Sequence, residues 1–216
     1  MKGVIVIGSG GHARVLIDTL RALRRDIIGI LDPDETRIGQ SVGGVIIIGN
    51  DDKVKEYNPN EIELVNGIGS IASTEKRKAV YEKFKRAGYA FTQVIHPAAT
   101  IMDDVQLGEG VQIMANAVIQ TGCVIGDNTI INTGAIVDHD CVIDEHVHVA
   151  PGAVLSGGVR IGAMTHIGTS ATIIQGIKIG QATIIGAGAV VVTDIPSEVK
   201  ALGVPAKIIE RRDNDG

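Results

Sequence analysis

The second half of the chain carries an aliphatic residue at every sixth position, without a miss or an insertion. The sixteen positions are Ile101, Leu107, Ile113, Ile119, Ile125, Ile131, Val137, Ile143, Val149, Leu155, Ile161, Ile167, Ile173, Ile179, Ile185 and Val191. A small or apolar residue follows each of them four places later, as Ala117 follows Ile113. A period of six is typical of a β-solenoid in which each repeat is a short strand plus a turn. We expect three repeats to form one coil, so that residues 18 apart stack.

The first half shows a different pattern, in which short apolar runs alternate with segments of helical periodicity. Strands are expected at 4–8, 27–32, 45–49, 61–69 and 90–95, and helices at 12–24 and 73–87. Such alternation favours a small parallel α/β unit of the Rossmann type. Pro97 marks the boundary, which predicts an α/β domain over 1–96 and an all-β solenoid with a C-terminal tail over 97–216.

A glycine-rich turn follows the first predicted strand, in the segment VIVIGSGGHARVLID at 4–18. Gly8, Gly10 and Ala13 fit the pattern G-x-G-x-x-A, and Asp32 lies near the distance expected of a ribose-binding carboxylate. The unit is only half of a dinucleotide-binding domain, so we expect no NAD. One nucleotide phosphate, held by the N–H groups of Gly10 and Gly11 at a helix N-terminus, fits better. A tight turn with no ligand is the simpler alternative.

The composition and charge of the chain limit the kinds of binding partner and cellular setting that are expected. The net charge is −5 and only five residues are aromatic, so phosphate neutralisation and base stacking both lack material and nucleic acid is not expected. The sequence contains no run of 18 uncharged apolar residues, so no membrane span is predicted, and the N-terminus has no signal-peptide pattern. Cys123 and Cys141 are 18 apart at inward positions, which predicts core residues rather than a disulfide. A reducing cytoplasm is the simplest setting.

Several short motifs give the chain a family resemblance over nearly its whole length. They are GSGGHA at 8–13, NGIGS at 66–70, HPAA at 96–99, NTGAIVDHDCVI at 132–143, HVAPGA at 148–153 and GVPAK at 203–207. The repeats resemble those of the hexapeptide-repeat acyltransferases. Both halves together resemble the two-domain bacterial sugar acetyltransferases of the PglD/NeuD type, including members from exopolysaccharide clusters.

This resemblance implies both a fold and a reaction. The solenoid would be a left-handed parallel β-helix, and the protein a homotrimer whose acetyl-CoA lies between neighbouring prisms. The acceptor would be the amino group of a nucleotide-linked 4-amino-6-deoxy sugar or, in one branch, a sialic acid hydroxyl. Direct transfer requires a base for the acceptor proton and a donor that stabilises the oxyanion.

The resemblance also assigns catalytic roles. His139 matches the base of a His-Glu pair, although the next residue here is Asp140 rather than glutamate. Asn132 matches a family asparagine close to the base. A solvated His-Asp pair on the rim of the solenoid is the alternative interpretation of the dyad.

The binding residues are implied in the same way. His148, Gly157, Thr169 and Ala187 fall at family positions that contact acetyl-CoA. His166 is expected to stack one coil above His148, and His146 is expected to be exposed.

On the acceptor side, His12 would lie near the sugar, and Asp32 and Gly69 would line the nucleotide pocket. In a trimer His12 would face His139 of a neighbour, which makes the active site composite.

Two functions from other classes compete with this hypothesis. Solenoids with three interfacial histidines can bind zinc and hydrate carbon dioxide, but the histidine spacing here does not match that triad, and we expect no metal. A non-catalytic nucleotide-sugar-binding protein would bind no CoA and would tolerate loss of His139. The sequence leaves open which nucleotide and which sugar are used, N- against O-acetylation, and the length of the acyl group.

Overall fold

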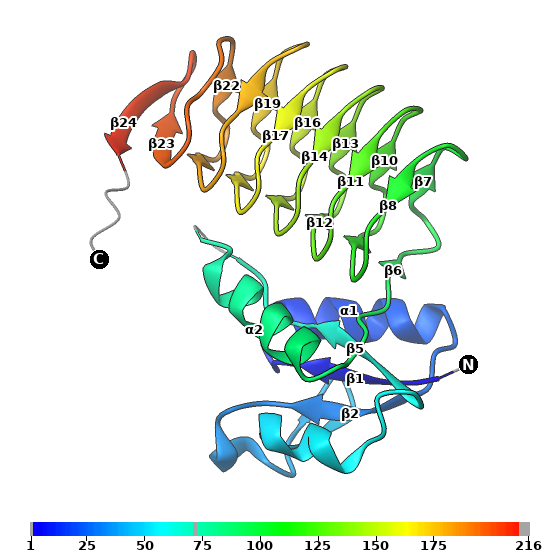
Figure 1. Ribbon diagram of the computed structural model, residues 1–216. Helices are drawn as coiled ribbons and strands as arrows, with labels where there is room; N and C mark the ends of the chain where they lie inside the picture. The colour runs from blue at the N-terminus through cyan, green and yellow to red at the C-terminus, as the bar shows by residue number, and fades with distance from the viewer. Residues whose placement is uncertain (1, 71–72, 212–216) are drawn as a thin grey trace.

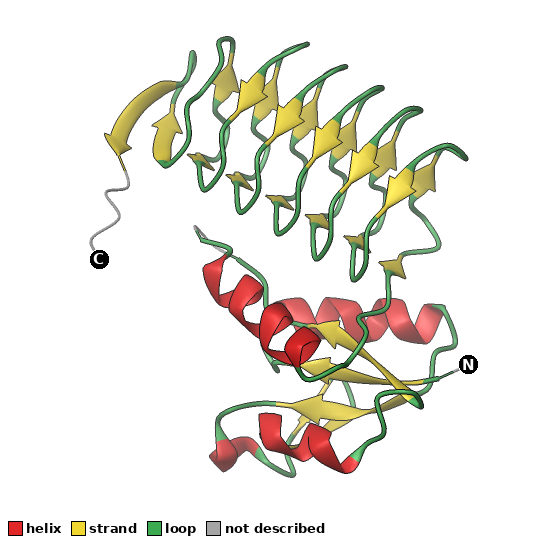
Figure 2. Ribbon diagram, in the orientation of Figure 1, coloured by secondary structure: helices red, strands yellow, loops and turns green. Residues whose placement is uncertain are grey.

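The computed structural model describes residues 2–70 and 73–211. A prism of stacked coils forms one end of the molecule and a smaller α/β domain lies beneath it (Figures 1 and 2). Sixteen two-residue strands build the prism, and each carries one aliphatic residue of the hexad series as its second residue. They are β7 (Thr100–Ile101), β8 (Gln106–Leu107), β9 (Gln112–Ile113), β10 (Val118–Ile119), β11 (Val124–Ile125), β12 (Ile130–Ile131), β13 (Ile136–Val137), β14 (Val142–Ile143), β15 (His148–Val149), β16 (Val154–Leu155), β17 (Arg160–Ile161), β18 (His166–Ile167), β19 (Thr172–Ile173), β20 (Lys178–Ile179), β21 (Ile184–Ile185) and β22 (Val190–Val191).

The strands form three parallel sheets, and partners along each sheet are 18 residues apart, as Val118 and Ile136 are. One sheet has the order β22-β19-β16-β13-β10-β7, and we call it the flat sheet. The second has the order β20-β17-β14-β11-β8. The third includes β21-β18-β15-β12-β9 and begins with β6 (Val94–Ile95), and at its other end it continues into β23 (Val199–Leu202) and β24 (Lys207–Arg211). The predicted coil of three hexads is therefore confirmed.

The hexad side chains point inward and form one continuous apolar core, in which Cys123 and Cys141 are fully buried and unbridged. At the corners between strands, every sixth residue from Gly110 to Gly188 has a positive φ. Glycine, asparagine and aspartate tolerate this left-handed conformation best. Asn128 and Asp140 occupy two of these corners, with φ of 54° and 59°.

The α/β domain has a five-stranded sheet of order β3-β4-β2-β1-β5, parallel except for β3. Its elements are β1 (Gly3–Ile7), α1 (Gly11–Ala22), β2 (Ile27–Leu31), the 3-10 turn η1 (Glu35–Arg37), β3 (Ser41–Val42), β4 (Val45–Gly49), the 3-10 turn η2 (Asp51–Glu56), β5 (Ile62–Asn66) and α2 (Glu75–Arg86). Alternate residues of β1 pack on opposite faces of the sheet. Val4 and Val6 contact α1, whereas Ile5 and Ile7 lie on the face covered by α2.

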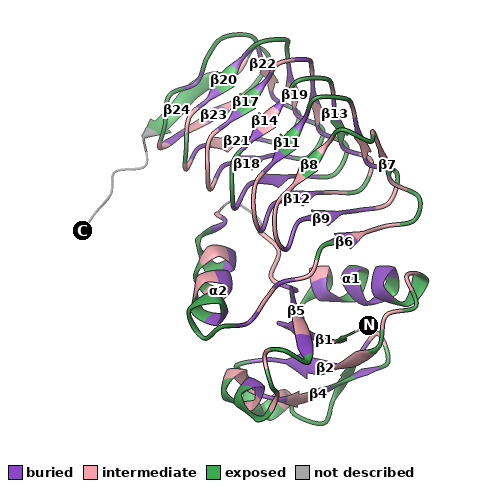
Figure 3. Cartoon of the chain, turned by 45° about the vertical axis from the view of Figure 1, so that its right-hand side comes forward, coloured by how far each residue is buried: buried purple, intermediate pink, exposed green. Residues whose placement is uncertain are grey.

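Figure 3 shows α1 beneath the first coil of the prism, and the two domains share buried contacts there. The expected strand over 90–95 is divided between them. Phe91 bridges to Leu64 beside β5, whereas β6 (Val94–Ile95) pairs with β9 in the first coil of the prism. Val94 and Met114 complete the apolar layer beneath α1. The chain thus passes into the prism through a shared core rather than through a free linker. None of the helices in the described part of the chain is long and apolar enough to cross a membrane.

Candidate functional site

A cavity of about 760 Å³ lies between the α/β domain and the third prism sheet. Its lining combines the N-terminus of α1, the loop after β5 and one corner of the prism: Gly10, Gly11, His12, Val15, Gly67, Ile68, Gly69, Ser70, Asn132, Thr133, His148, Ala150, Pro151, His166 and Thr169. The structure therefore gathers seven of the twelve predicted site residues around one space. We call it the interdomain cavity.

The start of α1 faces this cavity without a side-chain cap. A Cβ at Gly10 or Gly11 would meet nothing within 4 Å, so the first turn leaves room for a ligand. Unpaired N–H groups at such a helix start attract anions.

A hydrogen-bond chain fixes the tautomer of His12. The Gln112 amide donates from Nε2 to the carbonyl oxygen of Asn66, at 2.8 Å, which turns its Oε1 toward His12. His12 Nε2 therefore donates to that oxygen, at 2.7 Å, and Nδ1 carries the lone pair. Burial and the nearby charge of Arg77 lower the pKa of His12 to about 4, against the opposing effect of the Gln112 bond. His12 is therefore a neutral acceptor at physiological pH.

His148 lies deeper in the interdomain cavity and is 5% exposed. The backbone N–H of Thr133 donates to Asn132 Oδ1 at 2.8 Å, so the amide nitrogen of Asn132 must face His148 Nε2, which is 2.9 Å away. On the other side of the ring, Nδ1 lies 2.6 Å from Ser70 Oγ. Burial and the proximity of His166 lower the pKa of His148 well below its ordinary value.

His166 lies one coil above His148, as predicted, and their rings meet edge to face with centroids 5.1 Å apart. Its Nδ1 is 3.1 Å from the same Ser70 hydroxyl, and burial lowers the pKa of His166. Ser70 was not singled out from the sequence, although it closes the NGIGS motif.

Arg77, on α2, is a further residue that sequence reasoning missed. It is fully buried and donates to three backbone carbonyl oxygens, those of Asn66 and Ile68 at 2.8 Å and that of Asn128 at 3.0 Å. No carboxylate is among these partners, and burial lowers the pKa of Arg77 to about 9. This arginine fastens the loop after β5 to a corner of the prism.

The predicted catalytic dyad lies elsewhere, at the corner between β13 and β14. His139 Nδ1 and Asp140 Oδ2 are 2.8 Å apart, and the two side chains are 48% and 71% exposed. The Asp140 hydrogen bond, helped by the charge of Asp138, raises the pKa of His139. Because Nδ1 carries the bonded proton, Nε2 is free to accept one.

Two glycines leave the space that this dyad occupies. A Cβ at Gly157, one coil above, would lie 2.5 Å from His139 Cε1, inside van der Waals contact. A Cβ at Gly122, one coil below, would lie 2.5 Å from Asp140 Oδ1. Gly122 was not singled out from the sequence, but it stands 18 residues before Asp140, a spacing that identifies it.

The strands of the flat sheet begin beside the interdomain cavity and end beside the dyad. The two sites therefore lie along the two long edges of this sheet, one at each end of its strands. Asn132 and Thr169 belong to the corners that lead into this sheet, and Ala187 stands one coil beyond Thr169. His139 and Gly157 belong to the corners that lead out of it. Of the four predicted acetyl-CoA residues, Gly157 therefore lies on the dyad side of the flat sheet and the other three lie on the cavity side. Asn132 contacts His148 rather than His139.

Asp32 does not line the interdomain cavity. It lies just after β2, where Ser9 Oγ and the Asp34 N–H donate to its carboxylate and Arg37 is 3.7 Å away. Burial alone would raise the pKa of Asp32, but these three partners outweigh it and hold the pKa below the ordinary value. Its contact with a nucleotide stays a prediction.

The expectation that His146 is exposed was wrong, because it is 6% exposed. Tyr81 of α2 packs edge to face on its ring, with centroids 5.5 Å apart, and Asn128 lies 3.0 Å from its Nδ1. The hexad pattern places His146 at an outer corner, but it does not reveal that α2 covers that corner.

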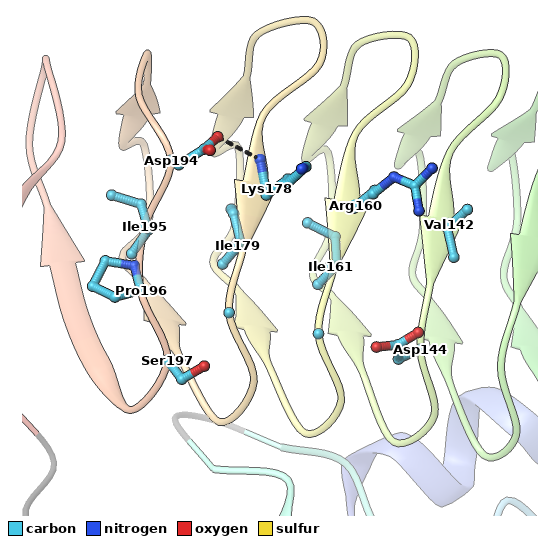
Figure 4. A pocket seen from close by; sticks show the side chains of 12 residues that line it. Val142, Asp144, Arg160, Ile161, Lys178, Ile179, Asp194, Ile195, Pro196 and Ser197 are labelled. Atoms are coloured by element: carbon cyan, nitrogen blue, oxygen red, sulfur yellow. Dashed lines mark hydrogen bonds between the residues drawn. The ribbon is translucent and has the colours of Figure 1, made fainter.

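A second hollow, of about 570 Å³, runs over β14, β17 and β20 (Figure 4). Arg160, Lys178 and Asp194 are among the residues that line it, and none of the predicted site residues does. Asp194 accepts a hydrogen bond from the Lys178 backbone, at 2.8 Å. Over residues 2–70 and 73–211, no three His, Cys, Asp or Glu side chains lie close enough together to hold a metal ion.

Family models match both halves of the chain. The PglD N-terminal domain matches residues 3–84, and the bacterial transferase hexapeptide repeat matches 104–138 and 122–157. A sequence search among curated proteins finds no match.

Solved structures similar to this chain share both domains. Perosamine N-acetyltransferase from Caulobacter crescentus, solved as a histidine variant with CoA and GDP-perosamine, is 41% identical with a TM-score of 0.89 and covers 97% of this chain and 98% of its own. The acetyltransferase domain of PglB from Neisseria gonorrhoeae is 37% identical with a TM-score of 0.89, covering 97% and 100%. WeeI from Acinetobacter baumannii is 25% identical with a TM-score of 0.86, covering 97% and 100%.

An α/β domain followed by a left-handed parallel β-helix, with histidines gathered between them, defines a class of two-domain hexapeptide-repeat acetyltransferases. At 41% identity over nearly the full length of both chains, this chain belongs to the PglD/NeuD-type family of bacterial sugar acetyltransferases. The predicted family and fold class are both confirmed.

Proposed function

We propose that the protein transfers the acetyl group of acetyl-CoA to the amino group of a nucleotide-linked 4-amino-6-deoxy sugar. The similar Caulobacter enzyme was solved with CoA and GDP-perosamine, and the Neisseria domain with acetyl coenzyme A. The observation on this chain that carries the proposal is the dyad, in which Asp140 orients the exposed His139 and leaves Nε2 as a proton acceptor.

The reaction is a direct transfer. The acceptor nitrogen forms a bond to the thioester carbonyl carbon while His139 Nε2 takes a proton from that nitrogen. The carbon–sulfur bond then breaks, and the CoA thiolate leaves and receives the proton from the imidazolium. Asp140 stabilises the imidazolium through its charged hydrogen bond, and no covalent acyl-enzyme is needed.

The active site is formed between chains of a homotrimer. The flat sheet separates the dyad from the interdomain cavity within one chain, so a neighbour is needed to bring them together. Exposed aliphatic side chains mark this sheet and its dyad edge: Ile136, Ile174 and Val192 are 40%, 40% and 42% exposed. Apolar patches of this kind favour association. Light scattering that gives a monomer at micromolar concentration would contradict this arrangement.

The decisive experiment follows acetyl-CoA consumption with a panel of UDP- and GDP-linked 4-amino sugars and with sialic acid. We expect turnover with a nucleotide amino sugar and a product that is acetylated on nitrogen. Turnover of sialic acid alone would assign O-acetylation instead. A protein that binds nucleotide sugars but consumes no acetyl-CoA would be a binding protein. The free buried cysteines are consistent with the cytoplasmic setting that we propose.

Asp32 tests the nucleotide side of the proposal. We expect Asp32→Ala to raise the KM of the nucleotide sugar by about tenfold, as loss of one charged hydrogen bond would, with the KM of acetyl-CoA unchanged. Equal changes in both constants would remove Asp32 from the nucleotide site.

A further inference from the structure

The Ser70 hydroxyl lies between two histidines that belong to consecutive coils of the prism. It is 2.6 Å from His148 Nδ1 and 3.1 Å from His166 Nδ1, and it comes from the loop after β5 in the other domain. A hydroxyl has one proton and two lone pairs, so Ser70 can donate to at most one of these rings, and at least one ring must donate to it.

The backbone decides which ring donates. The Thr133 N–H fixes Asn132 Oδ1, so the amide N–H of Asn132 points at His148 Nε2, which must be unprotonated. The proton of neutral His148 therefore lies on Nδ1 and is donated to Ser70 Oγ. His166 Nδ1 is the other partner of the Ser70 hydroxyl among the described residues, so the hydroxyl proton points to it, and neutral His166 carries its own proton on Nε2.

Both rings are suited to hold this neutral arrangement. They are 5% and 7% exposed, the rings meet edge to face at an interplanar angle of 88°, and burial disfavours the charged form of each. His166 Nε2 has no protein partner among the residues that the structure describes, and His166 lines the interdomain cavity.

We propose that Ser70 is a positioning residue that fixes the tautomers of His148 and His166 and thereby makes His166 Nε2–H a hydrogen-bond donor to an uncharged oxygen of a bound substrate. The four groups form a one-way relay from Asn132 through His148 and Ser70 to His166. An uncharged imidazole donor suits a carbonyl oxygen, and the thioester carbonyl is the one that gains charge during the reaction. Only this last assignment rests on the proposed function.

His12 complements this donor in the same cavity. Its Gln112 bond leaves Nδ1 as an acceptor, whereas the relay leaves His166 with a donor. Two neutral imidazoles of opposite hydrogen-bonding sense therefore line the space where donor and acceptor substrates would meet.

The test uses the full-length protein with ¹⁵N-labelled histidine, because ring-nitrogen shifts distinguish the two tautomers without any assay of activity. At about pH 7 we expect His148 as the Nδ1–H form and His166 as the Nε2–H form, both neutral. In Ser70→Ala, His148 keeps its form because Asn132 is intact, whereas His166 becomes a mixture of tautomers. Ser70→Thr keeps a hydroxyl and should restore His166. Ser73→Ala, whose hydroxyl instead accepts from the Glu75 N–H, is the control from the same loop.

Kinetics supply the functional readout. We expect Ser70→Ala to lower kcat/KM for acetyl-CoA by about five- to tenfold, the effect of one misplaced hydrogen bond, with no shift in the pH profile. An Nδ1–H or charged His166 in the wild-type protein would overturn the proposal, as would an unchanged His166 in Ser70→Ala. The wild-type measurement decides the matter even if the alanine variant does not fold. Failure of the acetyl-transfer assay would contradict the proposed function but would leave the tautomers measurable.

Discussion

The molecule holds two groups of histidines in opposite environments. His139 is about half exposed, is bonded to a carboxylate, and has a raised pKa. His12 and His148 are held by amides and a hydroxyl in the interdomain cavity, and their pKa values are lowered. Where environments move pKa values apart, the groups take different roles. The dyad is suited to take up a proton, whereas the cavity histidines are suited to hold fixed hydrogen bonds.

The largest effect is expected from removing the dyad histidine. His139→Ala should lower kcat by about 10²–10⁴-fold, the usual cost of losing a general base. Acetyl-CoA should still bind, and the oligomeric state should not change. Steady-state kinetics with calorimetric binding of CoA make the measurement, and His96→Ala, outside the site, is the histidine control. A near-normal kcat in His139→Ala would move the base elsewhere, with His12 the next candidate.

A smaller loss is expected when the dyad is kept but displaced. In Gly157→Ala the new methyl group overlaps the His139 ring, so the imidazole must turn. Misplacement by about 1 Å can cost about 10²-fold in kcat. The matched control is Gly158→Asn, because Gly158 has a φ of +68° that asparagine tolerates and open space around it. Equal kcat values in the two variants would show that the position of the ring does not matter.

Removing the buried arginine that joins the two domains should lower stability rather than change the chemistry. Arg77→Leu removes donors from three backbone carbonyl groups, those of Asn66, Ile68 and Asn128. At about 1 kcal/mol for each bond, we expect the free energy of unfolding to fall by about 3 kcal/mol, measured by urea denaturation. Exposed Arg86→Leu, on the same helix, should change it by less than about 0.5 kcal/mol. If the two variants were equally stable, Arg77 would not fasten the domains together.

The repeats and the family motifs made much of this architecture predictable. Each hexad residue from Ile101 to Val191 lies on its expected strand, because the periodicity records which side chains face the core. The same periodicity stacks His166 on His148. The glycine-rich turn and the family resemblance assigned Gly10 and Gly69 to the acceptor side and Thr169 to acetyl-CoA, and the structure places all three around one cavity.

The contacts between the domains were not predictable in the same way. Gln112 and His12 are 100 residues apart, Ser70 and His148 are 78 apart, and Arg77 and Asn128 are 51 apart. No local period encodes how α2 and the loop after β5 meet the prism. The error at His146 has the same origin, since Tyr81 covers a corner that the repeat alone leaves open.

The dependence of kcat/KM on pH in the wild type and in Asp140→Asn tests the division between the two groups most directly. A base must be neutral to act, and Asp140 raises the pKa of His139, so wild-type activity should rise with pH through a limb above the ordinary value of 6.5. Asp140→Asn removes the main cause of that shift, and its limb should move to lower pH. The ionisation of the acceptor amine is common to both proteins and cancels in the comparison. Superimposable profiles would contradict the account, because the pKa of the titrating group would then not depend on Asp140.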